Sequence, residues 1–340
     1  MKFMEKLLLR AGAGYPNYRI PGIVATARGT LLAVAEARLT SSDWADMDAI
    51  LLRSVDGGEN WSAPTVLGAG IARGSTANNP TLLATRSGAV FTFYCERYGV
   101  AELGGGVYYR VSLDDGVSWS TPVDISAACR PEYHVAFATG PTHGIETRAG
   151  ALIVPVWMVP RSARRDLKSH HPSVVSSLYS VDGGANWQMG ELIAAPGLND
   201  PSETIVAEVD RGVMFNMRNE SGRNRRAVAF SATGYSGWSE VIYDETLIDP
   251  VCNAGMVCAH DGVVLFVNPA STTSRERGCV RMSLDGGRSW PVSRVLREGS
   301  SAYSDIATTS DGWVHVLLET EPGFSITYYR FERDWLLGGK

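Results

Sequence analysis

The sequence predicts an all-β fold, in the form of a six-bladed β-propeller with four-stranded antiparallel blades. The first observation behind this prediction is an octamer, S-x-D-x-G-x-x-W, that is repeated along the chain. Four intact copies occupy residues 54–61, 112–119, 180–187 and 283–290, and a degenerate fifth at 231–238 has lost the aspartate. The second observation is the spacing of the copies. The third is a content of 36 glycines, which suits a turn-rich β-protein.

Each octamer has the composition of a tight hairpin turn. Aspartate can hydrogen-bond nearby backbone N–H groups and glycine tolerates positive φ, so the serine should end one strand and the tryptophan should begin the next. The five tryptophans are Trp61, Trp119, Trp187, Trp238 and Trp290. A period of about 50 residues that includes a hairpin is typical of four-stranded propeller blades, and 340 residues then provide about six blades.

Length and composition favour one domain that spans residues 1–340, because propeller blades do not fold as separate domains. The chain is 44% hydrophobic and 20% charged, as globular proteins usually are, and its net charge of −5 gives no indication of nucleic-acid binding. No apolar run approaches the roughly 18 residues of a membrane span, and no secretion signal is recognisable. The sequence as written therefore predicts a cytoplasmic protein, although a secreted or periplasmic protein trimmed of its signal would look the same.

The cysteines and histidines give no indication of a metal site. There are five cysteines, an odd number, and none forms a C-x-x-C pair, so no disulfide framework is predicted either. His170 and His171 are adjacent and lack the spacing of metal ligands. We therefore expect neither a metal nor an organic cofactor.

The two ends of the chain are expected to pair and so to close the ring of blades. Residues 1–10 read as a strand with no earlier segment to pair with. Residues 325–331, with the sequence SITYYRF, are the candidate partner.

The octamer resembles the Asp box of the sialidase (neuraminidase) superfamily, and other segments extend this resemblance. Residues 19–21 (RIP) resemble the R-I-P motif of that family, and residues 31–38 (LLAVAEAR) resemble the A-x-A-E-x-R strand that follows it. The resemblance implies that Arg19 is the first of three arginines that bind the carboxylate of the substrate. It also implies that Arg38 contacts the substrate or supports a residue that does, and that the boxes lie on the face away from the active site.

Asp43 lies five residues after Arg38, the offset at which members of this family carry their acid/base aspartate. Asp46 and Asp48 are the alternatives in the same segment. We expect the pKa of Asp43 to be raised by an anionic ligand and by an apolar loop beside Trp44.

A segment in the middle of the chain resembles a second motif of the family. Residues 202–218 follow the pattern S-E-x-x-x-x-E…N-x-R, which assigns Glu203 as the base that activates the nucleophile and Arg218 as the second arginine. Glu208 is the alternative to Glu203. It lies an odd number of residues away, however, and so points to the opposite face of a regular strand.

The third arginine is expected in residues 268–275 (NPASTTSR), which resemble an N-P-x…R segment of the family. This assigns Arg275 to the role, with Arg277 and Arg281 as the alternatives. Arg275 lies eight residues before the serine of the fourth intact box, the usual offset in the family.

The last motifs come near the end of the chain. Residues 302–305 (AYSD) resemble the motif that bears the nucleophilic tyrosine, which is then Tyr303. Glu319 lies on a segment that resembles the strand whose glutamate steadies the first arginine. A closed ring would bring this glutamate to Arg19, so we expect the two to pair.

Other polar and aromatic residues receive less specific interpretations. His143 reads as a structural histidine. The basic segment 161–171 reads as a solvated loop, with a basic rim that attracts anionic glycans as the alternative. Trp44 is a candidate for one wall of a pocket that holds an N-acyl group. Trp157 and Met158 are further candidates for this pocket, but ordinary packing inside a blade explains them at least as well.

The resemblance implies a retaining exo-glycoside hydrolase that releases a terminal sialic acid, or a related 2-keto sugar acid, from sialylated or related acidic glycans. Three arginines suit one carboxylate, because guanidinium is always charged and binds bidentately. A tyrosine nucleophile suits such a substrate, because a carboxylate nucleophile would be repelled by the carboxylate of the sugar.

Three alternatives remain open at this stage. They are a non-catalytic glycan-binding propeller, a trans-sialidase, and a hydrolase for a different ulosonic acid such as Kdo or the deaminated sialic acid. A pure binding protein would have no reason to keep Asp43, Glu203 and Tyr303 together. The oligomeric state is not predicted.

Overall fold

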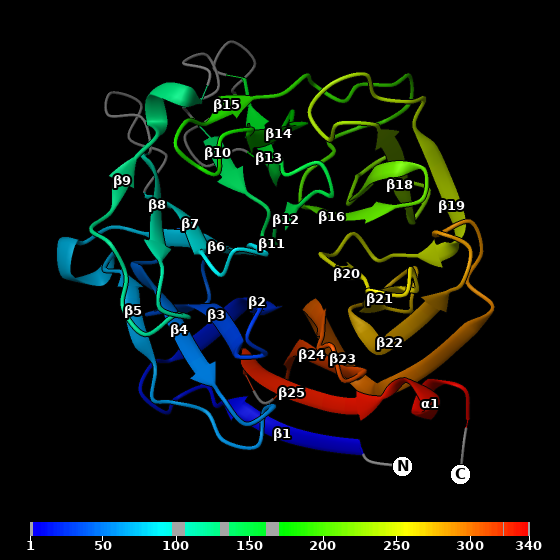
Figure 1. The fold of residues 1–340 in the computed structure, drawn as a ribbon. Coiled ribbons are helices and arrows are strands. Elements are labelled where there is room, and N and C mark those ends of the chain that lie inside the picture. The colour runs from blue at the N-terminus through cyan, green and yellow to red at the C-terminus, as the bar shows by residue number, and fades with distance from the viewer. Residues whose placement is uncertain (1–2, 97–105, 130–135, 161–169, 322, 339–340) are drawn as a thin grey trace.

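The computed structural model describes residues 3–96, 106–129, 136–160, 170–321 and 323–338. Almost all regular structure in these ranges is β-strand (Figure 1). The helices in the described ranges are α1 at Arg333–Leu336 and two short 3₁₀ turns at Ile71–Arg73 and Ser126–Ala128. The predicted all-β class is therefore confirmed. Within the same ranges, no helix has the length and apolar character needed to cross a membrane.

The described strands form five sheets, of which the first four have four or five strands each. The first contains β2 (Asn17–Ala25), β3 (Leu31–Arg38), β4 (Met47–Ser54) and β5 (Thr65–Gly68). The second contains β6 (Ala77–Ala84), β7 (Val90–Glu96), β8 (Val107–Ser112) and β9 (Val123–Asp124), with β11 (Thr142–His143) parallel to β6. The third contains β10 (Ala136–Thr139), β13 (Leu152–Val159), β14 (Val174–Ser180) and β15 (Gln188–Met189), with β12 (Ile145–Glu146) on β13. The fourth contains β16 (Thr204–Val209), β17 (Gly212–Met217), β18 (Arg225–Ser231) and β19 (Ile242–Ile248).

The fifth sheet has seven strands because one long strand belongs to two groups. In spatial order these are β1 (Phe3–Leu9), β25 (Ser325–Glu332), β24 (Trp313–Thr320), β23 (Val292–Thr308), β22 (Glu276–Ser283), β21 (Val264–Pro269) and β20 (Gly255–Cys258). The first half of β23 pairs with β22, and its second half pairs with β24. The sheet thus contains two successive groups of four strands that share β23.

The hydrophobic core lies between neighbouring sheets, so some strands are buried on both faces. All eight residues of β3 are buried, and so are all eight of β13. A strand covered on both faces reads as a nearly continuous apolar run. Figure 1 shows the sheets following one another around a common centre, in chain order from blue to red.

The first and last strands close the chain on itself, as the sequence predicted. β1 pairs antiparallel with β25, and Figure 1 shows the blue strand running beside the red one. The first octamer also packs on β25. The ring centroids of Trp61 and Tyr328 lie 5.3 Å apart, and Arg330 Nη1 lies 2.6 Å from Glu59 Oε1.

The serine of every intact octamer ends a strand, and its hydroxyl organises the turn that follows. In the first copy, Ser54 Oγ accepts the N–H of Gly58 at 2.9 Å and donates to Asp56 Oδ1 at 2.9 Å. The other three intact copies repeat both bonds. The expectation that the tryptophan begins the next strand is wrong for Trp61, Trp119, Trp238 and Trp290, because one to three residues separate each of them from that strand. Trp187 directly precedes β15.

The first octamer is well separated from the loop that carries Asp43. This loop enters β4 at Met47, and the octamer leaves the same strand at Ser54. Eight residues of extended chain at about 3.3 Å each lie between the two ends. The turn and the loop therefore occupy opposite ends of β4.

Candidate active site

A polar cavity brings together seven of the eight side chains that the sequence singled out. Its lining includes Arg19, Arg38, Asp43, Glu203, Arg218, Arg275 and Tyr303. The eighth, Glu319, lies behind Arg19 and binds it. These residues come from the first, fourth and fifth sheets and the loops beside them, so the cavity exists only when distant parts of the chain have assembled.

Tyr303 is buried in the cavity wall between a carboxylate and a guanidinium. It lies in the second half of β23, and only 6% of its surface is exposed. Its hydroxyl donates to Glu203 Oε1 at 2.6 Å and accepts from Arg218 Nη1 at 2.9 Å. Burial, and then the charge of Glu203, raise the pKa of Tyr303 above its ordinary value of 10, although nearby arginines oppose the shift. The side chain is therefore a neutral phenol in the unliganded protein.

The hairpin of β16 and β17 sets the distance between Glu203 and Arg218. Glu203 directly precedes β16 and Arg218 directly follows β17. The backbone N–H of Arg218 donates to the Glu203 carbonyl at 3.0 Å, and its Nη1 lies 2.5 Å from Glu203 Oε2. The alternative, Glu208, is near the other end of β16, where its carboxylate accepts the N–H of Arg148 at 2.6 Å. It does not line the cavity.

Arg19, on β2, is fixed by Glu319, on β24, which is the pair that a closed ring was expected to create. Glu319 Oε1 accepts from Arg19 Nε at 3.2 Å, and Oε2 accepts from Arg19 Nη2 at 3.3 Å. Oε1 also accepts the N–H of Ile20 at 2.8 Å. Ile20 has a φ of 56°, which a β-branched residue rarely adopts, and this bond helps to hold it there. The Arg19 guanidinium carbon lies 5.0 Å from the centre of the Tyr303 ring.

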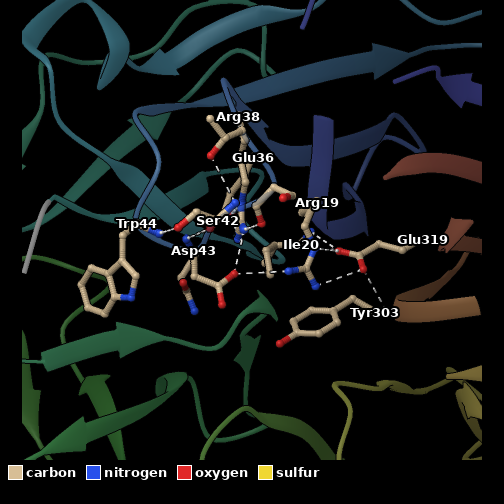
Figure 2. A network of polar contacts seen from close by, with 12 residues as sticks. Arg19, Ile20, Glu36, Arg38, Ser42, Asp43, Trp44, Tyr303 and Glu319 are labelled. Carbon is tan, nitrogen blue, oxygen red and sulfur yellow. Dashed lines mark hydrogen bonds and ion pairs between the residues drawn. The ribbon is translucent and has the colours of Figure 1, made fainter. Parts of the chain in front are cut away.

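Asp43 is held by two arginines (Figure 2). Its Oδ1 accepts from Arg38 Nη1 at 2.7 Å and from Arg19 Nη1 at 3.2 Å. Arg38 is 2% exposed and is held in turn by the fully buried Glu36, whose Oε2 accepts from Arg38 Nε at 2.6 Å. The other oxygen of Glu36 accepts the N–H of Asn79 at 2.6 Å, which ties this group to β6.

The expected rise in the pKa of Asp43 is wrong for the unliganded protein. Burial raises this pKa, but the charge and hydrogen bond of Arg38 and the charge of Arg19 outweigh burial, so that it falls below its ordinary value of 3.8. The Asp43 side chain is also 51% exposed. Its neighbours in space are two cations, whereas the ring of Trp44 packs on His170, with the centroids 5.4 Å apart.

Asp46 and Asp48, the alternatives to Asp43, do not line the cavity. Asp48 lies inside β4 and accepts the hydroxyl of Tyr15 at 3.1 Å and the N–H of Ile71 at 2.9 Å. Its carboxylate is therefore used to join two loops to the first sheet. Of the three aspartates, Asp43 is the one that reaches the cavity.

Arg275 reaches the cavity from the loop before β22. Its Nη2 donates to the carbonyl of Val251 at 3.0 Å, and its guanidinium carbon lies 5.4 Å from the centre of the Tyr303 ring. The alternatives, Arg277 and Arg281, do not line the cavity. Arg277 is half exposed, and Arg281 is buried within β22.

The cavity also contains residues that the sequence analysis did not place in it. They are Ile20, Glu36, Asn78, Asn79, His170, His171, Ser173, Ser202 and Glu220. Asn78 and Asn79 belong to β6, and Asn79 has a φ of 52°. The signal for these two was an N-N-P run at the start of an apolar strand, since such a run places polar side chains at a strand end.

One wall of the cavity is aromatic. His170 packs against Trp44 and, with its ring centroid 5.5 Å away, against Trp157. Met158 is buried and does not line the cavity. Residues 161–169, the greater part of the basic segment, lie outside the described residues. In the ranges that are described, no three His, Cys, Asp or Glu side chains are grouped as metal ligands would be.

His143 lies outside the cavity in a buried pair with Asp305, two residues beyond Tyr303. Its Nδ1 is 2.9 and 3.0 Å from the two oxygens of Asp305. Burial lowers the pKa of His143, but the charge and hydrogen bond of Asp305 raise it more, to above its ordinary value of 6.5. The position of this histidine agrees with its structural interpretation.

Comparison with known proteins assigns a family to this arrangement. A model of the BNR repeat-like domain matches residues 29–316. The chain belongs to this family. A sialidase of Micromonospora viridifaciens is 32% identical over 98% of this chain and 54% of its own length, and a sialidase of Bacteroides fragilis is 30% identical over 89% of this chain and 60% of its own. These matches place the chain in the sialidase superfamily, as the sequence motifs indicated.

A solved structure agrees with this assignment. Hadza microbial sialidase Hz136 superposes with a TM-score of 0.85 at 25% identity, over 98% of this chain and 69% of that one. The chain spans 54% of the length of the Micromonospora sialidase and 60% of the length of the Bacteroides sialidase.

Proposed function

We propose that this chain is a retaining exo-glycoside hydrolase that releases a terminal sialic acid, or a related 2-keto sugar acid, from acidic glycans. The observation that carries the proposal is the hydroxyl of Tyr303, bonded to both Glu203 and Arg218 in a cavity that Asp43 also lines. The named sialidases in the same family support the choice of sugar.

The carboxylate of the sugar would bind to Arg19, Arg218 and Arg275. All three line one cavity, and the guanidinium carbons of Arg19 and Arg275 lie 5.0 and 5.4 Å from the ring centre of Tyr303. A carboxylate held there would fix the anomeric carbon, to which it is attached, near the tyrosine hydroxyl. Guanidinium groups suit this task because they stay charged and bind carboxylates bidentately.

The chemistry would proceed in two displacements. In the first, Tyr303 Oη bonds to the anomeric carbon, Glu203 takes the phenolic proton, and Asp43 gives a proton to the departing glycosidic oxygen. In the second, Asp43 takes a proton from water, the water oxygen bonds to the same carbon, and Tyr303 leaves and recovers its proton from Glu203. Two inversions retain the anomeric configuration.

We also propose that the chain forms one domain with six blades. The first four sheets each supply one blade. The seven-stranded sheet supplies two, if it is divided where β23 changes its partner from β22 to β24. The pairing of β1 with β25 then completes the sixth blade.

A 2,3-difluoro sialic acid tests the nucleophile. Fluorine at C3 slows formation and breakdown of the adduct, while the fluoride at C2 leaves readily enough to rescue formation alone. Mass spectrometry of a protease digest should place the added mass on the peptide that contains Tyr303. Tyr303→Phe should abolish trapping and remain folded, whereas the matched control Tyr235→Phe should be trapped normally. An adduct on another residue, or a first-formed product of inverted configuration by NMR, would remove Tyr303 from this role.

A panel of 4-methylumbelliferyl ketosides tests the activity and the sugar. It should contain N-acetylneuraminic acid, its deaminated analogue and Kdo. Because Trp44 and Trp157 line the cavity, we expect kcat/KM to be highest for the N-acylated sugar. If none of the three ketosides is cleaved, the proposed hydrolase activity is refuted. Added lactose shows whether the sugar acid is transferred to water or to another sugar, because a trans-sialidase would convert lactose to sialyl-lactose.

A further inference from the structure

Arg19 is bound on two sides in the unliganded protein. Its Nε and Nη2 donate to Glu319, and its Nη1 donates to Asp43 Oδ1 at 3.2 Å. Figure 2 shows the Asp43 carboxylate facing the Arg19 guanidinium, with Glu319 on the other side. The donor that Arg19 turns toward the cavity is therefore already occupied by Asp43.

We propose that the carboxylate of the substrate displaces Asp43 from Arg19, and that Asp43 then takes up a proton from solvent. This inference rests on the proposed function, because it requires an anionic ligand that binds Arg19. It adds a coupling between two events. Binding of the carboxylate would itself convert Asp43 from an ionised acceptor into the protonated acid that the first displacement needs.

The geometry makes the two carboxylates compete. Asp43 Oδ1 accepts from the same Nη1 atom that faces the cavity, while Glu319 uses the other edge of the guanidinium. A ligand carboxylate at Arg19 thus places a second negative charge beside Asp43. Two carboxylates that share a site do not both ionise readily, and the one with fewer cations beside it is the one to accept a proton. Asp43 would lose Arg19 and keep only Arg38, whereas the ligand would gain three arginines, and the 51% exposure of the Asp43 side chain lets a proton arrive from solvent.

Arg38 would keep Asp43 in place after Arg19 has been released. Arg38 is 2% exposed, its Nε is fixed by the fully buried Glu36, and its Nη1 donates to Asp43 at 2.7 Å. The proton would then go to Oδ2 of Asp43, while Oδ1 continues to accept from Arg38. Asp43 would thus remain beside the anomeric centre.

The charges that face Asp43 come from three parts of the fold. Arg19 on β2 and Arg38 on β3 bind it directly, with Glu36 behind Arg38, and His170 approaches from the residues before β14. His170 is the other group that could bind a proton when an anion arrives. Burial lowers its pKa in the free protein, and Asp43 and Glu203 partly oppose this. The experiment must therefore distinguish proton uptake by Asp43 from proton uptake by His170.

The test is calorimetric titration of the whole chain with 2-deoxy-2,3-didehydro-N-acetylneuraminic acid between pH 4 and pH 7. Each pH is measured in two buffers of different ionisation enthalpy, which gives the number of protons taken up. We expect uptake that approaches one proton at the acid end and disappears toward pH 7. Within the window of uptake, the affinity should fall by up to about tenfold for each unit of pH. The methyl ester of the inhibitor lacks the charge and should bind without proton uptake.

Three variants identify the group that takes up the proton. Asp43→Asn should abolish uptake and bind the inhibitor more tightly than the wild type at pH 7, because the competing carboxylate is gone. His170→Gln should keep the uptake. Asp46→Asn, in the same loop but outside the cavity, is the matched control and should behave like the wild type.

The outcomes separate this inference from the function on which it rests. Tight binding with no proton uptake in the wild type would overturn the coupling and leave the hydrolase intact. Uptake that persists in Asp43→Asn but vanishes in His170→Gln would also overturn it and assign the proton to His170. If the inhibitor does not bind and no ketoside is cleaved, the proposed function fails first.

Discussion

Four arginines line the cavity, and the three proposed to bind the sugar carboxylate have three different partners. Arg19 binds Glu319, Arg218 binds Glu203, and Arg275 donates to the backbone carbonyl of Val251. Because a carbonyl is neutral, the charge of Arg275 is not cancelled by that contact. Arg275 should therefore contribute strongly to the binding of an anionic sugar.

Replacing Arg275 by alanine should weaken inhibition by 2-deoxy-2,3-didehydro-N-acetylneuraminic acid at least tenfold. Arg275 is exposed in the free protein, and a hydrogen bond to a charged group typically contributes about 1.5–3 kcal/mol, which corresponds to about tenfold or more in affinity. Arg277→Ala is the matched control, because that residue lies two positions away and outside the cavity. Inhibition constants measured for both variants decide the assignment. Equal inhibition of Arg275→Ala and the wild type would mean that another residue binds the carboxylate of the inhibitor.

The pair of His143 and Asp305 should make stability depend on pH in a defined direction. The pKa of His143 is raised in the folded protein above about 6.5, its value in the unfolded chain. The pair therefore stabilises the fold fully below pH 6.5, and this contribution is lost as the pH rises through the folded pKa. Urea unfolding of wild type and His143→Gln should show a difference in unfolding free energy that shrinks between pH 6 and pH 9. A difference that grows with pH would mean that the histidine is buried in its neutral form.

At the scale of elements, the octamer is a turn that tolerates the loss of its aspartate. In the degenerate copy, Ser231 Oγ still accepts the N–H of Gly234 at 2.9 Å. The hydroxyl of Thr233 accepts the N–H of Ser236 at 3.1 Å, in the place of the aspartate oxygen. The serine hydroxyl thus accepts a backbone N–H in all five turns, and the serine should contribute strongly to their stability.

The contribution of the serine to stability can be measured within a single turn, that of the second octamer. Ser112 is 1% exposed, accepts the N–H of Gly116 at 2.8 Å and donates to Asp114. Ser112→Ala should lower the free energy of unfolding by about 1–3 kcal/mol, because it leaves a buried N–H without a partner. Ser118 also donates to Asp114 but is exposed, so Ser118→Ala should change stability by less than about 0.5 kcal/mol. Urea midpoints at constant m-value test the difference, and equal losses would contradict it.

At the scale of the whole molecule, the contact between the first octamer and β25 allows no additional atom. Gly58 has a φ of 90°, and a Cβ added there would lie 1.9 Å from the hydroxyl of Tyr328. Tyr328 belongs to the strand that pairs with β1. This glycine therefore reports on how tightly the two ends of the chain are joined.

Gly58→Ala should destabilise the protein more than a glycine substitution that creates backbone strain alone. Gly183 in the third octamer is the matched control, since its φ is 74° and no atom lies within 4 Å of an added Cβ. Overpacking adds about 1–3 kcal/mol to the cost of the positive φ that both variants share. Thermal unfolding of the two proteins gives the comparison. If Gly58→Ala were as stable as Gly183→Ala, the contact between the first octamer and β25 would be loosely packed.

The sequence predicted the fold class, the pairing of the chain ends and seven of the charged and phenolic residues that line the cavity. Those residues sit in short motifs with fixed spacings, as Tyr303 does in AYSD. Glu36 and Asn79 were missed because their bond joins residues 43 positions apart and leaves no local pattern. For the unliganded protein, the pKa of Asp43 was misjudged for a related reason. Sequence shows that Trp44 is adjacent, whereas the guanidinium groups of Arg38 and Arg19 meet Asp43 only in the folded structure.

The bond between Arg19 and Glu319 joins residues 300 positions apart, and this has a consequence for synthesis on the ribosome. At about 5–20 residues per second, the nascent chain carries Arg19 for about 15–60 seconds before Glu319 has been added. Throughout that time β1 has no β25 beside it, and Arg19 can pair with Asp43 but not with Glu319. Unpaired strand edges of this kind make incomplete chains prone to aggregation, and a ribosome that stalls before residue 319 releases a product that lacks β25 and the Arg19–Glu319 pair.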